Sequence, residues 1–202
     1  MPAKRILIAT RNPGKVREFA LALEPEGFEV FGMDALSDAR EVEETGETFA
    51  ANARLKAEGY SSHTDMLVLA DDSGIEVDAL DGRPGVQSAR YGGSELDDDG
   101  RCRLMLHELH GVPDERRTAR FRCVLALARE GKTLATFDGV IEGRINHGAQ
   151  GENGFGYDPL FFHPPSGCTT AQLAPAEKQK VSHRGKAIAA LLQELRSGEL
   201  QV

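Results

Sequence analysis

Residues 4–23 decide the fold, and they read KRILIATRNPGKVREFALAL. The apolar run Lys4–Thr10 leads into Asn12-Pro13-Gly14, which predicts a short buried strand followed by a turn. From residue 14 onward, apolar side chains recur at i, i+3, i+4 and i+7, the spacing of one helix face. These side chains are Val16, Phe19, Ala20 and Leu23. The stretch therefore predicts a strand, a turn and a helix in immediate succession.

The same alternation continues toward the middle of the chain. Strands are predicted at Phe28–Phe31 and Met66–Ala70, with a helix over Glu47–Tyr60 between them. That helix is expected to turn four side chains inward: Phe49, Ala50, Ala53 and Ala57. The residues Asp71-Asp72-Ser73-Gly74 follow the third strand directly and suggest a polar turn. Strands that alternate with helices indicate the α/β class.

The second half of the chain has longer strands. A helix is predicted over Asp97–His110, and the runs Thr118–Ala128 and Lys132–Ile145 predict a hairpin that turns at residues 130–132. Alternate residues of the first arm are apolar and share one face: Ala119, Phe121, Cys123, Leu125 and Leu127. Ser182 is expected to cap a last helix whose inner residues are Ala187, Ile188, Leu191, Leu192 and Leu195. The predicted fold is α/β, with an elongated mixed β-sheet, flanking helices and two lobes around a central substrate cleft, all within one domain of residues 1–202.

Composition narrows the class of protein. The 202 residues are 40% hydrophobic and 28% charged, which excludes a disordered or fibrous chain. No stretch approaches ~20 consecutive apolar residues, and the N-terminus has no secretory pattern, so a cytoplasmic protein without membrane contact is expected. Acidic residues outnumber basic ones by 8, which argues against a nucleic-acid partner. Three widely spaced cysteines suit neither a disulfide framework nor a zinc site.

A first candidate site lies between the first strand and the first helix. The loop Thr10-Arg11-Asn12-Pro13-Gly14-Lys15 precedes a helix, whose unpaired backbone N–H groups and positive dipole end favour phosphate. Lys15 adds a positive charge. The loop is not a Walker motif, because GxxxxGK[ST] occurs nowhere in the chain. Taken alone, the loop is better interpreted as a turn with a helix cap.

Carboxylates form a second candidate. Glu41, Glu43 and Glu44 lie before the second helix. Asp71 and Asp72 directly follow a buried strand, where α/β folds place functional groups. Such oxygen ligands suit Mg²⁺, which also binds substrate phosphates. The alternative is a solvated charge run and a plain polar turn.

Two further candidates lie near the C-terminus. Phe155 stands between glycines in the run Gly151–Pro159, which would let a flat ligand stack on its ring. A turn whose aromatic ring packs on the core is the alternative. Near the last helix, three potentially cationic donors oppose the helix dipole and suggest an anionic or carbonyl-rich partner. These donors are Lys178, His183 and Arg184.

Taken in order, these elements resemble the inosine triphosphate pyrophosphatase (Ham1-like) family, which acts on non-standard purine nucleoside triphosphates. The resemblance runs from residue 10 to residue 185. It rests on six motifs: Thr10–Lys15; Glu43-Glu44-Thr45-Gly46 together with Asn52 to Lys56; Asp71-Asp72-Ser73-Gly74; Pro84-Gly85 together with Ser88-Ala89-Arg90-Tyr91; Phe155-Gly156-Tyr157-Asp158-Pro159; and Ser182-His183-Arg184-Gly185. Six motifs in one order are highly specific. Arg11 departs from the family pattern, which has glycine there.

The resemblance implies Mg²⁺-dependent hydrolysis to a nucleoside monophosphate and pyrophosphate by a homodimer. It implies that Glu43, favoured over Glu44, and Asp72 bind Mg²⁺, and that Asp72 is the general base. The implied substrate-binding residues are Thr10, Arg11, Asn12, Pro13, Gly14, Lys15, Lys56, Ser73, Phe155, Gly156, Tyr157, Asp158, Lys178, His183 and Arg184. Two alternatives stay open: a related house-cleaning pyrophosphatase for pyrimidine or other modified nucleotides, and a non-catalytic nucleotide-binding module.

Overall fold

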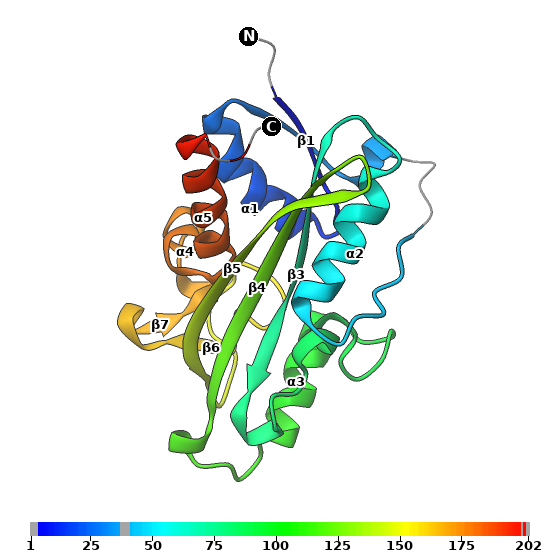
Figure 1. The fold of residues 1–202 in the computed structure, drawn as a ribbon. Coiled ribbons are helices and arrows are strands. Elements are labelled where there is room, and N and C mark those ends of the chain that lie inside the picture. The colour runs from blue at the N-terminus through cyan, green and yellow to red at the C-terminus, as the bar shows by residue number, and fades with distance from the viewer. Residues whose placement is uncertain (1–3, 37–40, 199, 201–202) are drawn as a thin grey trace. The chain divides into compact units, whose positions relative to one another are not determined.

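A computed structural model describes residues 4–36, 41–198 and 200. The strands form one mixed sheet in the order β2-β1-β3-β4-β5-β6-β7 (Figure 1). Their bounds are β1 (Lys4–Ile8), β2 (Phe28–Phe31), β3 (Leu67–Val77), β4 (Thr118–Arg129), β5 (Lys132–Ile145), β6 (Phe161–His163) and β7 (Cys168–Thr169). The helices are α1 (Pro13–Leu23), α2 (Phe49–Ser61), α3 (Asp98–Glu108), α4 (Pro175–Val181) and α5 (His183–Ser197). The predicted α/β class with a mixed sheet and flanking helices is confirmed.

Strand pairing follows the connections between the strands. β1 pairs in parallel with both β2 and β3, as expected for strands joined through helices. β6 pairs antiparallel with β5 and with β7. Glu130 and Gly131 join β4 to β5 with φ values of 52° and 74°, the positive values that a two-residue hairpin turn requires. The hairpin predicted from the sequence is therefore confirmed.

The chain divides into two compact units. Unit 1 comprises Met1–Asp72, Cys123–Asp138 and Lys186–Val202, and unit 2 comprises Ser73–Arg122 and Gly139–Gly185. The cleft predicted from the sequence and the assignment of one domain stay predictions.

Unit 1 has helices on both faces of its strands. Figure 1 shows α2 on the opposite side of β1 and β3 from α1 and α5. Its core cluster lies on the side of α1 and α5 and contains Ile6, Ile8, Phe19, Leu23, Phe28, Leu67, Leu69, Cys123, Leu125, Leu127, Phe137, Ala187, Ile188 and Leu191. Alternate residues of β1 and β3 are also buried, including Leu7 and Val68. Both faces of these strands are therefore covered, as is usual for parallel strands.

Unit 2 has a separate core around α3. Ile75, Met105 and Phe121 belong to this core, together with Val77, Leu80, Cys102, Leu109, Ala119, Ile141, Ile145, Tyr157, Leu160 and Phe161. Asp97 caps α3 by accepting a 2.7 Å hydrogen bond from Gly100 N. The buried Arg117 guanidinium donates to the carbonyl oxygens of Leu109, Ile145 and Asn146 at 2.8 to 2.9 Å.

The third strand is longer than the sequence suggested. The polar turn expected at Asp71-Asp72-Ser73-Gly74 is wrong, because β3 continues through these residues to Val77. A Cβ atom on Gly74 would lie 2.4 Å from the Gly85 carbonyl oxygen, so only glycine fits there. Ser88 Oγ accepts a 2.9 Å hydrogen bond from Ile75 N, which supplies a buried partner for that amide. The polar residues are thus accommodated by partners distant in sequence. The short helix α4 was not predicted either.

The other predicted elements agree with the structure to within one to three residues. Thr48 caps α2, and Ser182 Oγ accepts a 3.0 Å hydrogen bond from Gly185 N at the start of α5. Ala50 is only half-buried, in contrast to the other predicted inner residues of α2. The three cysteines are free thiols.

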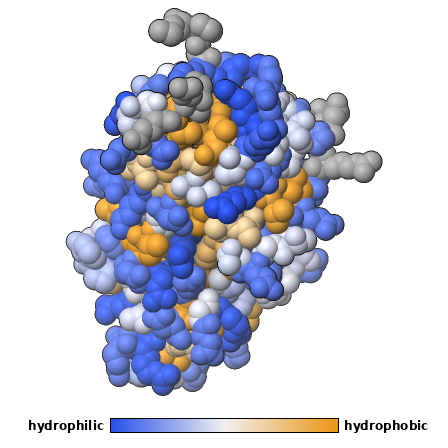
Figure 2. All heavy atoms as spheres, in the orientation of Figure 1, coloured by the Kyte–Doolittle hydropathy of each residue, from blue (hydrophilic) through white to orange (hydrophobic). Residues whose placement is uncertain are grey.

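Surface apolar groups are dispersed. Leu21, Leu55 and Leu134 are the large hydrophobic residues most exposed among those described. Figure 2 shows apolar patches separated by hydrophilic residues on the visible face. Within the described residues, no helix combines the length and apolar character needed to cross a bilayer.

Candidate active site

The predicted phosphate loop is organised by Asn12. Its Oδ1 accepts hydrogen bonds from Gly14 N (2.8 Å) and Lys15 N (3.2 Å), and Asn12 N donates to Thr10 Oγ1 at 3.2 Å. The expectation of unpaired N–H groups at this helix start is therefore wrong for these two amides, because the cap already satisfies them. These two amides are therefore already engaged within the loop.

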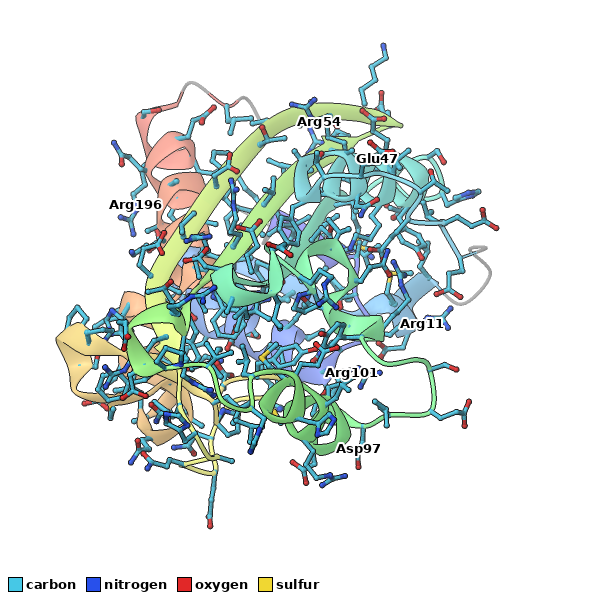
Figure 3. The ribbon with its side chains drawn as sticks, turned by 90° about the horizontal axis from the view of Figure 1, so that it is seen from below. Arg11, Glu47, Arg54, Asp97, Arg101 and Arg196 are labelled. Carbon is cyan, nitrogen blue, oxygen red and sulfur yellow. The ribbon has the colours of Figure 1, made fainter. Side chains whose placement is uncertain are left out.

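Arg11 is exposed at the outer side of this loop, where Figure 3 shows its side chain at the periphery. A pocket of about 570 Å³ adjoins the loop. Its lining residues are Thr10, Arg11, Pro13, Val16, Gly32, Met33, Asp34 and Leu36. The loop thus borders a space large enough for phosphate groups, with Arg11 among its lining residues.

Lys15 is held by a buried carboxylate. Its Nζ donates to Asp71 Oδ1, and the Cys123 thiol donates to Asp71 Oδ2 at 3.1 Å. The Asp71 side chain is fully buried, and the Lys15 side chain is 16% exposed. Asp71 therefore fixes the ammonium of a predicted phosphate-binding lysine, a contact that the sequence analysis did not identify. The available indication in the sequence was the adjacent pair Asp71-Asp72. Because neighbouring residues of a strand point to opposite faces, the two carboxylates are expected to have different partners.

Lys56 reaches across from α2 to the carboxylates. Its Nζ donates to the Asp71 carbonyl oxygen at 2.7 Å and lies 3.4 Å from Asp72 Oδ1. Glu44 Oε2 is also 3.4 Å from this nitrogen. The ammonium that the resemblance assigned to the triphosphate is thus bound between two carboxylates here. Opposite charges at this distance attract strongly where water is excluded.

Asp72 is a buried carboxyl group whose pKa is raised. It is 6% exposed, and its Oδ2 makes no hydrogen bond to any described residue. Burial raises the pKa of Asp72, and the nearby charge of Glu44 raises it further, whereas Lys56, Asn52 and Lys15 lower it. Desolvation is the largest of these effects, because a buried carboxylate loses its hydration. A carboxylate of this kind is poised to accept a proton.

The two adjacent glutamates differ in placement. Glu44 is half-buried beside Lys56 and Asp72, whereas Glu43 is exposed. The structure therefore places Glu44 next to the carboxylate that the resemblance pairs with Glu43.

The oxygens of this cluster suit a divalent cation. Within the described residues, no three or more His, Cys, Asp or Glu side chains converge as a complete metal site. Mg²⁺ commonly takes only one or two protein carboxylates and completes its shell with water and substrate phosphates. The buried, unpartnered Oδ2 of Asp72 is an appropriate oxygen donor, so the residues present fit Mg²⁺.

A second group of predicted site residues surrounds Asp158 in unit 2. Its Oδ2 accepts hydrogen bonds from Lys178 Nζ at 2.6 Å and Phe155 N at 2.9 Å, while Oδ1 accepts from Thr170 Oγ1 at 2.8 Å. Gly154 has a φ of 78°, and a Cβ atom there would lie 2.2 Å from Asp158 Oδ2. The glycine loop is therefore wrapped tightly on one buried carboxylate, which sets the position of Phe155.

Two cations face the Phe155 ring. Lys178 Nζ lies 4.8 Å and Arg184 Cζ 5.5 Å from the ring centroid. Arg184 is 1% exposed and donates a 2.8 Å hydrogen bond to Ser73 Oγ. The predicted base platform and its donors are thus brought together, and the cation–π geometry orders the two long side chains.

The remaining predicted residues of this group make hydrogen bonds and a ring contact to other residues of unit 2. The Tyr157 hydroxyl donates to the Ser88 carbonyl oxygen at 2.8 Å, and the His183 ring stacks on Phe121 with centroids 4.7 Å apart. Gly156 N donates to Asp98 Oδ2 at 2.7 Å. These contacts position the residues around Phe155. We call Phe155, Lys178 and Arg184 the Phe155 region. Whether the same residues touch a ligand stays a prediction.

Comparison with known proteins assigns the chain to a family. A sequence model of the Ham1 family matches residues 6–194. A dITP/XTP pyrophosphatase of Geobacillus kaustophilus is 52% identical over 188 residues, which cover 93% of this chain and 92% of the relative. The solved HAM1 protein of Coxiella burnetii is 38% identical with a TM-score of 0.86, covering 96% and 99% of the two chains. The Ham1 protein of Staphylococcus aureus is 41% identical with a TM-score of 0.83, covering 98% and 100%. With a family model that matches residues 6–194, and with relatives and solved structures similar over nearly its whole length, the chain belongs to the Ham1 family.

Proposed function

We propose that this protein hydrolyses non-standard purine nucleoside triphosphates, namely ITP, XTP and their deoxy forms, to the nucleoside monophosphate and pyrophosphate. The activity named for its 52% identical relative supports this reaction. The observation in the structure that supports it most is Asp72, a buried carboxylate with an unpartnered oxygen beside Lys56. Removal of such nucleotides would cleanse the nucleotide pool.

In the proposed reaction, a water oxygen attacks the α-phosphorus and the bond to the bridging oxygen of pyrophosphate breaks. Asp72 accepts the proton of this water, a role that suits its raised pKa. Lys15 and Lys56 offset the negative charge of the departing pyrophosphate, with Thr10, Arg11 and Asn12 as further donors. Mg²⁺, when bound, would neutralise phosphate charge and orient the triphosphate. Glu43 and Asp72 are its proposed ligands, and the position of Glu44 makes that residue the competing choice.

Base selection is assigned to the Phe155 region. The base would stack on Phe155, and Lys178 and Arg184 would donate hydrogen bonds to the 6-oxo group of hypoxanthine or xanthine. Adenine has an amino group at this position, which would leave a buried donor unpaired, a costly arrangement. The buried cations beside the ring support this assignment.

The remaining predictions belong to the same proposal. A homodimer and a cytoplasmic location are proposed from the family resemblance and the composition. A related house-cleaning pyrophosphatase for other nucleotides would use the same lysines and carboxylates. A binding module without catalysis has no need of a buried acid such as Asp72.

The test is pyrophosphate release from ITP, XTP, dITP, ATP and GTP, each measured with Mg²⁺ and with EDTA. Fast release that requires Mg²⁺ and is limited to the first three nucleotides is expected. Release from other nucleotides would keep the mechanism and change the substrate. If none is hydrolysed, the binding-module alternative holds and the roles of Asp72 and Glu43 are wrong.

A further inference from the structure

One face of α2 contacts the segment that carries the glutamates. Asn52 and Lys56 are four residues apart on this helix, so they share a face, and they are 1% and 8% exposed. Arg54, between them in sequence, is exposed instead (Figure 3). Lys56 reaches Glu44, as described above, and Asn52 Oδ1 accepts a 2.7 Å hydrogen bond from Gly46 N. We call Glu43–Gly46 the acidic segment; α2 binds it at two points.

The contact at Gly46 is close. A Cβ atom on this residue would lie 2.7 Å from Asn52 Oδ1 and 2.7 Å from Ala51 Cβ. Real Cβ atoms essentially never approach other atoms so closely, so a side chain here would push the acidic segment away from α2. The backbone at Gly46 therefore lies directly on the first turn of the helix.

The other end of the Asn52 amide is directed at Asp72. Because Oδ1 is engaged by Gly46, the orientation of the amide is fixed and Nδ2 points to the opposite side. This nitrogen is buried and makes no hydrogen bond of ordinary geometry to any described residue, and the Asn52 side chain interacts with the Asp72 carboxyl. An unpaired buried N–H₂ group is costly, which favours a carboxylate next to it.

We propose that Asn52 is a positioning residue that docks the acidic segment on α2, so that a glutamate of this segment and Asp72 are held side by side for a divalent cation. Asn52 does not touch the substrate in this role. It acts on the cation site through Gly46 and the glutamates. The inference rests on the proposed function for the cation, while the docking itself does not depend on a metal.

The variants separate the acceptor oxygen of Asn52, Oδ1, from the N–H₂ group of the same side chain. Asn52→Ala removes the acceptor, and Asn52→Asp keeps an acceptor oxygen for Gly46 N. Gly46→Ala leaves Asn52 intact and disturbs the docking sterically, which gives an independent route to the same defect. Thr48→Ala is the matched control, because Thr48 Oγ1 accepts a 3.2 Å hydrogen bond from Ala51 N in the same helical turn and serves as the cap of α2.

Two measurements that do not need turnover test the docking in the full-length protein. Amide hydrogen exchange at residues 46 and 51 is followed by NMR in the wild type and in the variants, including Gly46→Ala. Mn²⁺ affinity is measured by titration without nucleotide. Asn52→Ala is expected to expose the Gly46 amide and to weaken Mn²⁺ binding about 10-fold, the lower range for losing a residue that supports metal ligands. Gly46→Ala should weaken Mn²⁺ similarly. Asn52→Asp should keep the amide protected and Mn²⁺ binding at least as tight.

Steady-state kinetics add a third measurement. At saturating nucleotide, the Mg²⁺ concentration for half-maximal rate should rise in Asn52→Ala, while KM for nucleotide at saturating Mg²⁺ changes less than twofold. The Thr48→Ala control should lower the melting temperature without altering Gly46 exchange or Mn²⁺ affinity.

Three outcomes would overturn the inference. Unchanged Gly46 exchange in folded Asn52→Ala would show that no docking bond exists. Mn²⁺ affinity that stays within twofold of wild type in Asn52→Ala and Gly46→Ala would show that docking does not serve the cation. Weakening of Mn²⁺ in Asn52→Asp equal to that in Asn52→Ala would assign the effect to the N–H₂ group instead. If the wild-type protein binds no Mn²⁺ and hydrolyses nucleotide in EDTA, the proposed metal is wrong. Amide exchange at Gly46 would still test the docking in that case.

Discussion

Lys56 Nζ lies 3.4 Å from Asp72 Oδ1, and the two side chains are only 10% and 8% exposed. A buried ion pair gains Coulomb energy but loses the hydration of both ions. For Asp72 the loss is the larger effect, because burial raises its pKa in spite of the lysine. The protein therefore keeps a charged group where it reduces stability, which is typical of a group kept for its chemistry.

Asp72→Asn should separate activity from stability. Loss of the general base is expected to lower kcat at least ~10²-fold. The same variant should melt at a higher temperature than wild type at neutral pH, since asparagine carries no charge to desolvate. Pyrophosphate release and thermal unfolding measure the two effects.

The stability difference should depend on pH in a defined direction. The pKa of Asp72 is above its ordinary value of 3.8 in the folded state, so folding favours the protonated form. The favourable contribution is fully present below pH 3.8 and is lost as pH rises through the folded pKa. The advantage of Asp72→Asn should thus be small at low pH and grow as pH rises. A variant that melts below wild type at neutral pH would mean that the attraction to Lys56 outweighs burial.

Lys178→Met should destabilise the protein through Asp158. The two side chains are 6% and 4% exposed, and removal of the lysine leaves a buried carboxylate without its cation. The expected loss in the free energy of unfolding is about 3–5 kcal/mol, measured by urea denaturation. The double variant with Asp158→Asn should recover part of this loss. If the double variant is as unstable as the sum of the singles, the pair is not coupled.

Arg184→Lys should alter base selection more than phosphate chemistry. Lysine keeps the charge but loses the planar group that lies 5.5 Å from the Phe155 ring and binds Ser73. We expect kcat/KM for ITP to fall about 10-fold or more, with a smaller change for ATP, so that the ITP/ATP ratio falls. Ser73→Ala separates the hydrogen bond from the ring contact. An unchanged ratio in Arg184→Lys would remove this residue from base selection.

The thiols should react unequally with a water-soluble thiol reagent. Cys168 is half-buried, whereas Cys102 and Cys123 are buried, and burial raises the pKa of the Cys102 thiol to about 12. One fast equivalent is expected from native protein and three after denaturation. Cys168→Ser should abolish the fast phase. Fast modification of Cys123 would contradict its enclosure beside Asp71.

The spacing of apolar residues predicted most helices and strands, because these elements depend on local sequence. The helix after Asn12 and the hairpin at Glu130 and Gly131 were predictable from period and turn chemistry. The extension of β3 was not, because Ser88, which bonds to Ile75 N, lies far along the chain. The run of two aspartates, serine and glycine has the composition of a turn. It is recognised as a strand only when its partners from distant parts of the chain are known.

The site was predictable as a set of residues but not as a set of contacts. The lysines and acids were identified, yet their partners depend on side-chain direction in the folded protein. Spacing alone does not distinguish Glu43 from Glu44, and only the structure places Glu44 near Asp72. Asn52 lies in a stretch that carries the family resemblance, but no role was predicted for it, since one amide inside a helix has no chemistry of its own. Its i, i+4 relation to Lys56 was the available indication.

The division of the chain also constrains how the protein can fold during synthesis. Unit 1 is assembled from three separated segments, and Ala187, Ile188 and Leu191 complete a core that begins with Ile6. At ~5–20 residues per second, the ribosome takes roughly 9–36 s to reach these residues after Ile6 has been made. Through that interval the apolar side chains of β1 have α1 beside them but lack α5, the second helix of the same core. Synthesis of α5, rather than emergence of the first strands, should therefore set the time at which unit 1 completes its core.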